Sequence, residues 1–403
     1  MKENFKRIVL KNGFTILFEK RNLPVVSIAF AVREGGINET CEEKGISHFI
    51  EHMLYKGTSK RNVRQIAEAI EKNGGELNGF TSEEVTAYWC KIPSKHLQIG
   101  LDVLSDLVKN PLFDKKEVEK ERKVIFEEIK MYKDNPPSHV LSEFNSCLYT
   151  GTMGMNLAGT YETMSSLDRK KLVNKFKKVY APNNMILCIV GDADLDLIEK
   201  FVLKNFGNSQ GSVPQIPFET KNEIRFEKRK GIDQANLVFG FHMPLANNPL
   251  SHAALCLISL MAGGMSSRLF SEIREKRNLA YAVKGMAEIG KNLSHGIIYF
   301  GTPKESVEEI KKLVVKEFKK VSKELKEKEL KMVKEQLIGN HQINLENSQE
   351  QMVHLLAAEI EGNAERFYDF EKDILAVKLK DVKALAKKVA DGSYSFFALI
   401  PED

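Results

Sequence analysis

The stretch that decides the fold is Gly45-Ile46-Ser47-His48-Phe49-Ile50-Glu51-His52-Met53-Leu54-Tyr55. At the spacing of about 100° per residue of a helix, both histidines, Glu51 and Tyr55 fall on one side. The apolar residues fall on the other side: Ile46, Phe49, Ile50, Met53 and Leu54. We therefore expect a helix that packs on a core through its apolar face and presents two imidazoles and a carboxylate to a cavity.

His48 and His52 lie four residues apart, so on a helix their rings project from the same face about one turn apart. Two imidazole ligands of a single zinc ion need this separation. With Glu51 the residues form the pattern His-x-x-Glu-His, which inverts the commoner His-Glu-x-x-His zinc motif. A pair of histidines alone is also compatible with a solvated or core position, so the zinc interpretation requires a third ligand.

A second helix, predicted from Asp114 to Lys133, supplies candidates for that ligand. Its predicted apolar stripe consists of Val118, Val124, Ile125 and Tyr132. Glu121 and Glu128, seven residues apart, fall into the stripe, whereas the other two central acids, Glu119 and Glu127, point elsewhere.

A carboxylate in a buried stripe is costly unless it is paired or binds a cation. The residues therefore favour Glu128 or Glu121 as the third ligand. The alternative is that one of them forms a structural salt bridge, with Arg122 or Lys91 as its partner.

Composition limits the class of protein. The 403 residues exceed the usual size of one core, so two domains of about 200 residues are expected. Lys and Arg total 60 against 55 Asp and Glu, and the net charge of +5 is spread over mixed-sign segments, which argues against nucleic-acid or membrane binding. Five scattered cysteines without a Cys-x-x-Cys pair, and the lack of an apolar leader, predict a cytoplasmic protein.

The second half of the chain repeats the order of the first half without its metal-binding residues. An apolar strand at 236–242 precedes a helix at 250–261, where the first half has its motif helix. Between the halves, Gly207 to Pro217 is rich in Gly, Ser, Gln and Pro, as is typical of a linker. We predict two copies of one α/β unit: a zinc-binding catalytic domain at 1–206, a linker at 207–225, and a domain without metal at 226–403.

Four sequence blocks, in the correct order, resemble the zinc peptidases of the inverted motif, which include pitrilysin, insulysin and the mitochondrial processing peptidase. The closest resemblance is to the short bacterial members that are similar to the processing peptidase. The blocks are His48 to Thr58, Asn73 to Tyr88, Glu121 to Ile129, and Ser267 to Tyr281. One departure is Gly79, where Ala is usual; we expect it to matter little, because the backbone contacts substrate there.

The resemblance implies an α+β fold of two homologous α/β domains, each a mainly antiparallel sheet flanked by helices. It also implies a metalloendopeptidase with one Zn²⁺ per chain, held by His48, His52 and Glu128. Glu51 is then the general base, and Glu121 is a supporting acid beside the ligands.

Substrate binding is implied for three further residues: Asn78 in the first half, and Arg274 and Tyr281 in the second. The strand predicted at 85–92, with its approach at 77–81, is suited to pair with a peptide backbone as an added strand. Since family members enclose the site with four such domains and this chain supplies two, a homodimer is expected. A heterodimer with an inactive paralogue is the alternative.

Three functions stay open at this point. The first is a zinc endopeptidase or oligopeptidase that cleaves peptides or unfolded segments. The second is a maturation peptidase dedicated to one peptide. The third is a non-catalytic structural subunit, which is disfavoured because such members tend to lose ligands and this chain has kept all three together with Glu51.

Overall fold

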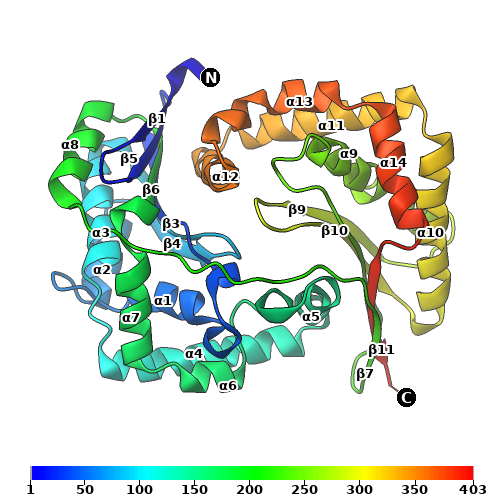
Figure 1. Cartoon of the computed structure of the whole chain (residues 1–403), viewed down its shortest axis with the longest axis horizontal. Helices are drawn as coiled ribbons and strands as arrows, with labels where there is room; N and C mark the ends of the chain where they lie inside the picture. Colours follow the sequence, from blue (N-terminus) through cyan, green and yellow to red (C-terminus); the bar gives the residue numbers. More distant parts are fainter. Residues whose placement is uncertain (1, 403) are drawn as a thin grey trace. The chain divides into compact units, whose positions relative to one another are not determined.

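The computed structural model describes residues 2–402 and divides them into two compact units. The first unit is formed by residues 2–129, 156–217 and 344–368, and the second by 130–155, 218–343 and 369–402. Each unit is one mixed sheet flanked by helices, as predicted (Figure 1). None of the helices in this described range is long and apolar enough to span a membrane.

The sheet of the first unit has the strand order β1-β2-β6-β3-β5-β4. Only the β2–β6 pair is parallel, so the sheet is mainly antiparallel, as expected. In spatial order its strands are Phe5–Val9, Thr15–Lys20, Met185–Gly191, Val25–Val32, Thr86–Pro93 and Glu76–Thr81. β4 therefore lies at an edge, with β5 as its one neighbour in the sheet.

Both faces of the four central strands of this sheet are buried, and successive side chains alternate between the faces. On β3, Ile28 and Phe30 join the core beneath the helices, whereas Ala29 and Ala31 join a smaller core on the opposite face. The first core is covered by α1 (Ile46–Leu54), α2 (Val63–Glu71), α3 (Leu97–Lys109), α4 (Lys115–Asp134), α6 (Tyr161–Ser166), α7 (Arg169–Val179) and α8 (Leu195–Asn205).

The opposite face of the first sheet is covered by α12 (Ser348–Glu361). Met352, Leu355 and Leu356 of this helix pack in the smaller core with the odd-numbered residues of β3. A hydrogen bond of 2.9 Å joins the hydroxyls of Ser27 and Ser348. The helix comes from the second half of the sequence but belongs to the first unit.

The sheet of the second unit has the order β7-β11-β8-β10-β9, which repeats β2-β6-β3-β5-β4 of the first. Again one pair, β7–β11, is parallel. Its strands are Ile224–Arg229, Ser395–Pro401, Ala235–His242, Ser294–Thr302 and Ala282–Ile289. The prediction of one architecture in two copies is confirmed.

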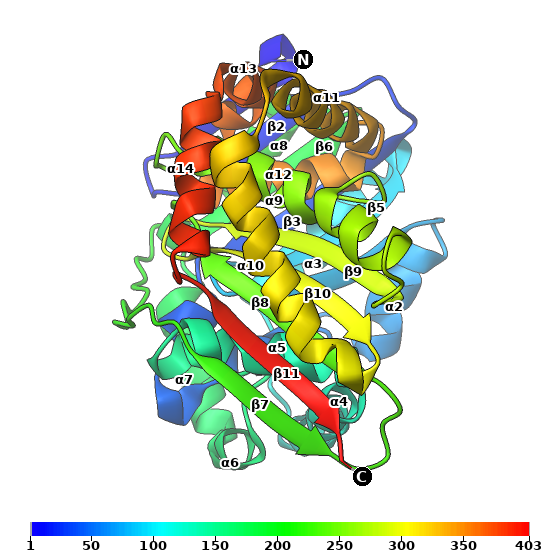
Figure 2. The same ribbon diagram turned by 90° about the vertical axis from the view of Figure 1, so that its right-hand side faces the viewer.

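One face of the second sheet lies under α10, which crosses it in Figure 2, and α14 packs beside α10. The helices of this unit are α5 (Pro136–Leu148), α9 (Ser251–Ala262), α10 (Val307–Glu324), α11 (Glu327–Asn344), α13 (Phe370–Ala376) and α14 (Leu379–Ala390). α5 packs on β8 and β11. Gly240 makes room for it, since a Cβ there would lie 2.5 Å from the ring of Phe144.

The compact units differ from the predicted domains 1–206 and 226–403 in two segments. Residues 130–155, with α5, belong to the second unit, and residues 344–368, with α12, belong to the first. Each of these helices buries its apolar face on the sheet of the unit formed mainly by the other half of the sequence. Within the predicted linker 207–225, residues 207–223 form no helix or strand apart from an isolated bridge at Thr220, and β7 begins at Ile224.

Candidate active site

Helix α1 presents the motif as predicted. Gly45 precedes it with a φ of 93°, a left-handed conformation that favours glycine. The five apolar residues of the helix are fully buried in the first core. His48, Glu51, His52 and Tyr55 are half-buried on the other side, so the predicted division of faces is confirmed.

Helix α4 brings two carboxylates to the same place. Glu121 is buried and Glu128 is half-buried, whereas Glu119 and Glu127 are exposed, as predicted. The predicted stripe was wrong at Val124 and Tyr132, which are exposed. The buried side is Val118, Glu121, Arg122 and Ile125, in steps of three and four residues from Val118; Val124, six residues away, points elsewhere.

His48, His52 and Glu128 form the one group of three or more potential metal ligands among the described residues. The Nε2 atoms of the histidines lie 3.2 Å apart, and Oε2 of Glu128 lies 3.6 and 3.7 Å from them. With zinc bonds of about 2.0–2.1 Å at tetrahedral angles, neighbouring ligand atoms lie about 3.3 Å apart. The three donors therefore fit one zinc ion, and three protein ligands leave its fourth position open.

Glu121 lies beside this group. Its Oε1 is 3.2 Å from Nδ1 of His52, and its Oε2 is 2.7 Å from Nζ of Lys56. Burial acts to raise the pKa of Glu121, but the hydrogen bonds from His52 and Lys56 outweigh it and lower the pKa. An acceptor at Nδ1 fixes the tautomer of a metal-binding histidine.

The salt-bridge alternative named other partners for these acids. Arg122 pairs with Glu119 at 3.0 Å, and Lys91 bonds to Asn347. Lys56, which stands four residues after His52, is the partner that was missed; its spacing on the motif helix was the available signal.

Burial and mutual charge set the protonation of the histidines. Burial, followed by the neighbouring charge of His52, lowers the pKa of His48 to about 3, which keeps this imidazole neutral as a metal ligand must be. Burial also acts to lower the pKa of His52, but the bond to Glu121 and the charges of Glu51 and Glu128 raise it overall.

Glu51 is on the same face but is not one of the three clustered donors. Its Oε2 accepts a 2.8 Å hydrogen bond from Oγ1 of Thr81 on β4. Burial raises the pKa of Glu51, although the bond from Thr81 opposes the shift. A carboxylate with a raised pKa next to a metal-ligand group is what a general base requires.

Gly79 of β4 lies against Tyr55 and Glu51. A Cβ on Gly79 would lie 2.6 Å from the hydroxyl of Tyr55, 2.9 Å from the carbonyl oxygen of Ala87 and 3.0 Å from Oε1 of Glu51. The Tyr55 hydroxyl is buried and has no hydrogen-bond partner in the described part of the chain. Glycine at position 79 therefore leaves room for Tyr55 and Glu51, and an alanine there would require these side chains to shift.

Asn78 is exposed on the edge strand β4, and its Oδ1 accepts a 2.8 Å bond from the backbone N–H of Gly79. Arg274 and Tyr281 belong to the second unit. Arg274 is exposed in a π-helical turn, Phe270–Glu275, with its guanidinium 4.8 Å from the ring centre of Phe270. Tyr281 is half exposed and rests on Gly301, where a Cβ would collide with its ring. The substrate-binding roles of these residues stay predictions.

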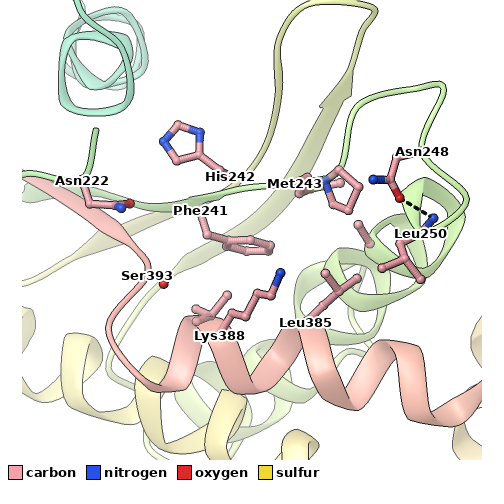
Figure 3. Close-up of a pocket in the computed structure, with 12 residues that line it drawn as sticks. Asn222, Phe241, His242, Met243, Asn248, Leu250, Leu385, Lys388 and Ser393 are labelled. Carbon is pink, nitrogen blue, oxygen red and sulfur yellow. Dashed lines mark hydrogen bonds between the residues drawn. The ribbon is translucent and has the colours of Figure 1, made fainter. Parts of the chain in front are cut away.

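A cavity of about 410 Å³ lies in the second unit, between the end of β8 and helices α9 and α14. Figure 3 shows Phe241, Leu385 and Lys388 pointing into it. None of the predicted site residues is among those described as lining it, and it offers no group of metal ligands. Among the described residues, the grouped metal ligands therefore lie on α1 and α4 of the first unit, with Glu51 of α1 and Thr81 of β4 beside them.

Comparison with known proteins agrees with this geometry. The family model described as "Insulinase (Peptidase family M16)" matches residues 15–161. A second family model, described as "Peptidase M16 inactive domain", matches residues 166–337. An uncharacterized zinc protease of Bacillus subtilis is 32% identical over 404 residues, 98% of each chain, and one of Rickettsia felis is 34% identical over 347 residues, 84% of each. The chain belongs to peptidase family M16.

Solved structures share the M16 fold. A protease from Helicobacter pylori aligns with a TM-score of 0.92 at 21% identity, covering 98% of this chain and 99% of that one. A putative M16-like peptidase from Alicyclobacillus acidocaldarius aligns with a TM-score of 0.86 at 17% identity, covering 99% and 98%. The first M16 match contains all three clustered ligands and Glu51, whereas Arg274 and Tyr281 fall in the match described as inactive.

Proposed function

We propose that this chain is a zinc-dependent endopeptidase or oligopeptidase that hydrolyses peptide bonds of peptides or unfolded segments. The observation that carries the proposal is the triangle of donor atoms from His48, His52 and Glu128 beside Glu51. Zinc bound there would supply an acidified water and a Lewis acid for the carbonyl oxygen.

The side chains around the triangle have separate tasks. Glu51 takes a proton from the attacking water and returns it to the leaving amine. The bond from Thr81 to Oε2 orients the carboxylate of Glu51, and Oε1 is the oxygen proposed to carry the proton. Glu121 accepts the Nδ1–H of His52, which directs the lone pair of Nε2 toward the ligand triangle.

Substrate recognition is proposed at the free edge of β4. The backbone of an extended peptide can add to this edge as a further strand, which gives affinity with loose side-chain selectivity. Asn78 on that strand is proposed to contact the peptide directly. Arg274 and Tyr281 are proposed to hold the substrate from the second unit.

Replacement of Glu51 by Gln tests the function. We expect kcat for a peptide library to fall about 10³-fold, within the range for loss of a general base, while bound zinc per chain is unchanged. Glu127→Gln, an exposed acid of α4, is the control and should hydrolyse as the unmodified protein does. Hydrolysis by Glu51→Gln at the unmodified rate would contradict the mechanism. Bound zinc with no library peptide cleaved by the unmodified chain would instead favour a dedicated maturation enzyme or a structural subunit.

The proposed assembly is a homodimer. The support is the four-domain enclosure that the family resemblance implies, of which one chain supplies two domains. Light scattering of the purified chain measures this directly: a mass of two chains is expected. A monomer that gains activity only with a second, ligand-free family member would replace the homodimer by a heterodimer.

We also propose that the protein works in the cytoplasm. All five cysteines are free thiols, and only Cys41 is exposed. Free thiols persist in reducing compartments, so this usage fits one. Fractionation of cells that produce the native chain should place it with cytoplasmic markers.

A further inference from the structure

The loop before α1 carries a carboxylate that none of the catalytic steps uses. Glu39 is fully buried, and its two oxygens accept hydrogen bonds from the backbone N–H groups of Gly45 (2.9 Å) and Ser47 (2.8 Å). The first N–H groups of a helix have no partner within it, and an anion there is favoured by the helix dipole. Glu39 thus holds the end of α1 immediately before His48.

The same end of the helix is fixed from other directions. Gly45 lies against the chain at Ala158, since a Cβ on it would come within 2.6 Å of that carbonyl oxygen. The hydroxyl of Ser47 donates a 2.8 Å bond to Oε1 of Glu34, and Nζ of Lys175 lies 2.9 Å from the same oxygen. Translation or rotation of α1 would break several of these contacts at once.

A buried cation, Lys44, lies beside Glu39. Nζ of Lys44 lies 3.7 Å from Glu39 and 3.3 Å from Glu83, and it also bonds to the carbonyl of Gly36 at 3.1 Å. Three buried carboxylates (Glu34, Glu39 and Glu83) thus share two ammonium groups (Lys44 and Lys175) and the positive end of α1.

A network of this kind is poorly explained by stability alone, because a buried ion pair can often be replaced by apolar residues without loss of stability. Its directional bonds do specify one position and one rotation of the helix. Metal and catalytic groups must be held within about 0.5 Å of their working geometry. A network that fixes the first turn of α1 can supply this precision for His48, which follows that turn.

We propose that Glu39 is a positioning residue for the zinc site. Its carboxylate, bonded to the first turn of α1 and backed by Lys44, sets the helix so that His48 and His52 converge with Glu128 and Glu51 reaches Thr81. The inference rests on the proposed function for its catalytic consequence but not for its effect on metal affinity.

Glu39→Gln is the decisive variant. It keeps the size of the side chain but removes the charge, and it turns an NH₂ group toward one of the two backbone donors. By analogy with groups that orient metal ligands, we expect zinc affinity to fall about 10- to 100-fold and kcat to fall while KM stays within about twofold. Zinc affinity is measured by competition with a chelator, well below the melting temperature of each variant.

The matched control is Glu19→Gln. Glu19 is equally buried in the first unit, and its described hydrogen bonds are to Arg21, Gln351 and Tyr368, away from α1. This variant should lower the melting temperature without changing zinc affinity. An equal loss of zinc affinity in both variants, or unchanged affinity in Glu39→Gln, would overturn the proposal.

Two further outcomes keep the tests independent. If Glu39→Gln does not fold, Glu39→Asp keeps the charge but shortens the side chain, so that it no longer reaches the N–H groups of both Gly45 and Ser47; zinc affinity should then fall severalfold, and unchanged affinity would contradict the positioning role. If the unmodified chain binds zinc but cleaves no peptide, the proposed function fails, whereas a loss of zinc affinity in Glu39→Gln still supports the role of Glu39.

Discussion

Two helices at corresponding places in the two units, α1 and α9, differ in what they leave uncovered. Each follows the strand that is third in the shared order, β3 or β8, and each packs against the edge hairpin of its own sheet, β4–β5 or β9–β10. α1 is buried on one side and presents His48, Glu51 and His52 on the other. In α9 all but two of the twelve residues are buried, and none of them forms a group of metal ligands with others in the described chain.

The difference shows that the fold does not create the chemistry by itself. The same sheet order and hairpin support a helix that is buried almost all round in one unit and a helix with one polar, half-buried face in the other. The metal-ligand group arises from two histidines on α1 and from Glu128 of α4, with Glu121 of α4 bonded to His52. Function is therefore a property of one helix face and its neighbours, which the following predictions test.

The largest effect is expected from the acids of α4. Glu128→Gln removes a ligand atom, so we expect zinc binding to be lost at micromolar metal and hydrolysis to fall about 10³-fold or more. Glu121→Gln leaves all three ligands and should lower zinc affinity about 10- to 100-fold. Glu335→Gln on α11, an exposed acid of the other unit, is the control. Metal analysis decides the assignment: a larger loss in Glu121→Gln would reverse the two roles.

The motif helix and the sheet class were predictable from the sequence because they depend on local periodicity. The two faces of α1 follow from its 3.6-residue repeat. On α4 the same reasoning narrowed the third ligand to Glu121 or Glu128, but it could not separate them, since both carboxylates turn toward α1. Val124 was misplaced because an apolar residue was taken to be buried, whereas its position in the helical period turns it to solvent.

Long-range contacts could not be read from local patterns. The apolar faces of α5 and α12 indicate that each helix is buried, but not which sheet covers it, so the exchange of these helices was missed. Glu39 stands in an irregular loop, where no period marks a buried carboxylate. Lys175 gave a weak signal, since it falls with Leu172 and Val179 on the buried side of α7.

An intermediate effect is expected at a pair of glycines that correspond between the units. Gly79 of β4 faces Tyr55 at the end of α1, and Gly285 of β9 faces Ala262 at the end of α9, where a Cβ would lie 2.8 Å from the methyl group of that alanine. Gly79→Ala should lower kcat/KM on the order of 10- to 100-fold, because displacement of Tyr55 or Glu51 disturbs the base. The double variant Gly79→Ala/Tyr55→Phe lacks the tyrosine hydroxyl and should regain most of the lost kcat/KM.

Gly285→Ala provides the comparison for this pair. We expect it to cost about 1–3 kcal/mol of unfolding free energy through overpacking, with kcat/KM per folded molecule unchanged. Denaturant titration and steady-state kinetics of the four proteins separate the two results. A double variant no more active than Gly79→Ala would show that the hydroxyl of Tyr55 is not the obstacle.

The smallest effect is expected at the salt bridges of α12 and α5, the two helices that belong to the unit formed mainly by the other half of the sequence. On α12, the buried Glu359 bonds to Arg7 at 2.7 and 2.8 Å and to Arg33 at 2.7 Å; on α5, the more exposed Glu143 pairs with Arg225 at 3.2 Å. Glu359→Gln should lower the unfolding free energy by about 2 kcal/mol, because the arginines left behind are partly hydrated. Glu143→Gln should cost less than about 1 kcal/mol.

The pH dependence of the unfolding free energy tests the ion pairs of Glu359 further. Burial acts to raise the pKa of Glu359, but the bonds from Arg7 and Arg33 outweigh it and hold the pKa below its ordinary value. A carboxyl group with a lowered folded pKa stabilises fully above its unfolded pKa, about 4.3 for Glu, and loses that stabilisation as the pH falls through the folded pKa. The difference in unfolding free energy between the unmodified chain and Glu359→Gln should thus be constant from pH 7 to about 5 and shrink below about 4. A difference that stays constant into that acid range, in denaturant titrations at each pH, would show that α12 is held by packing alone.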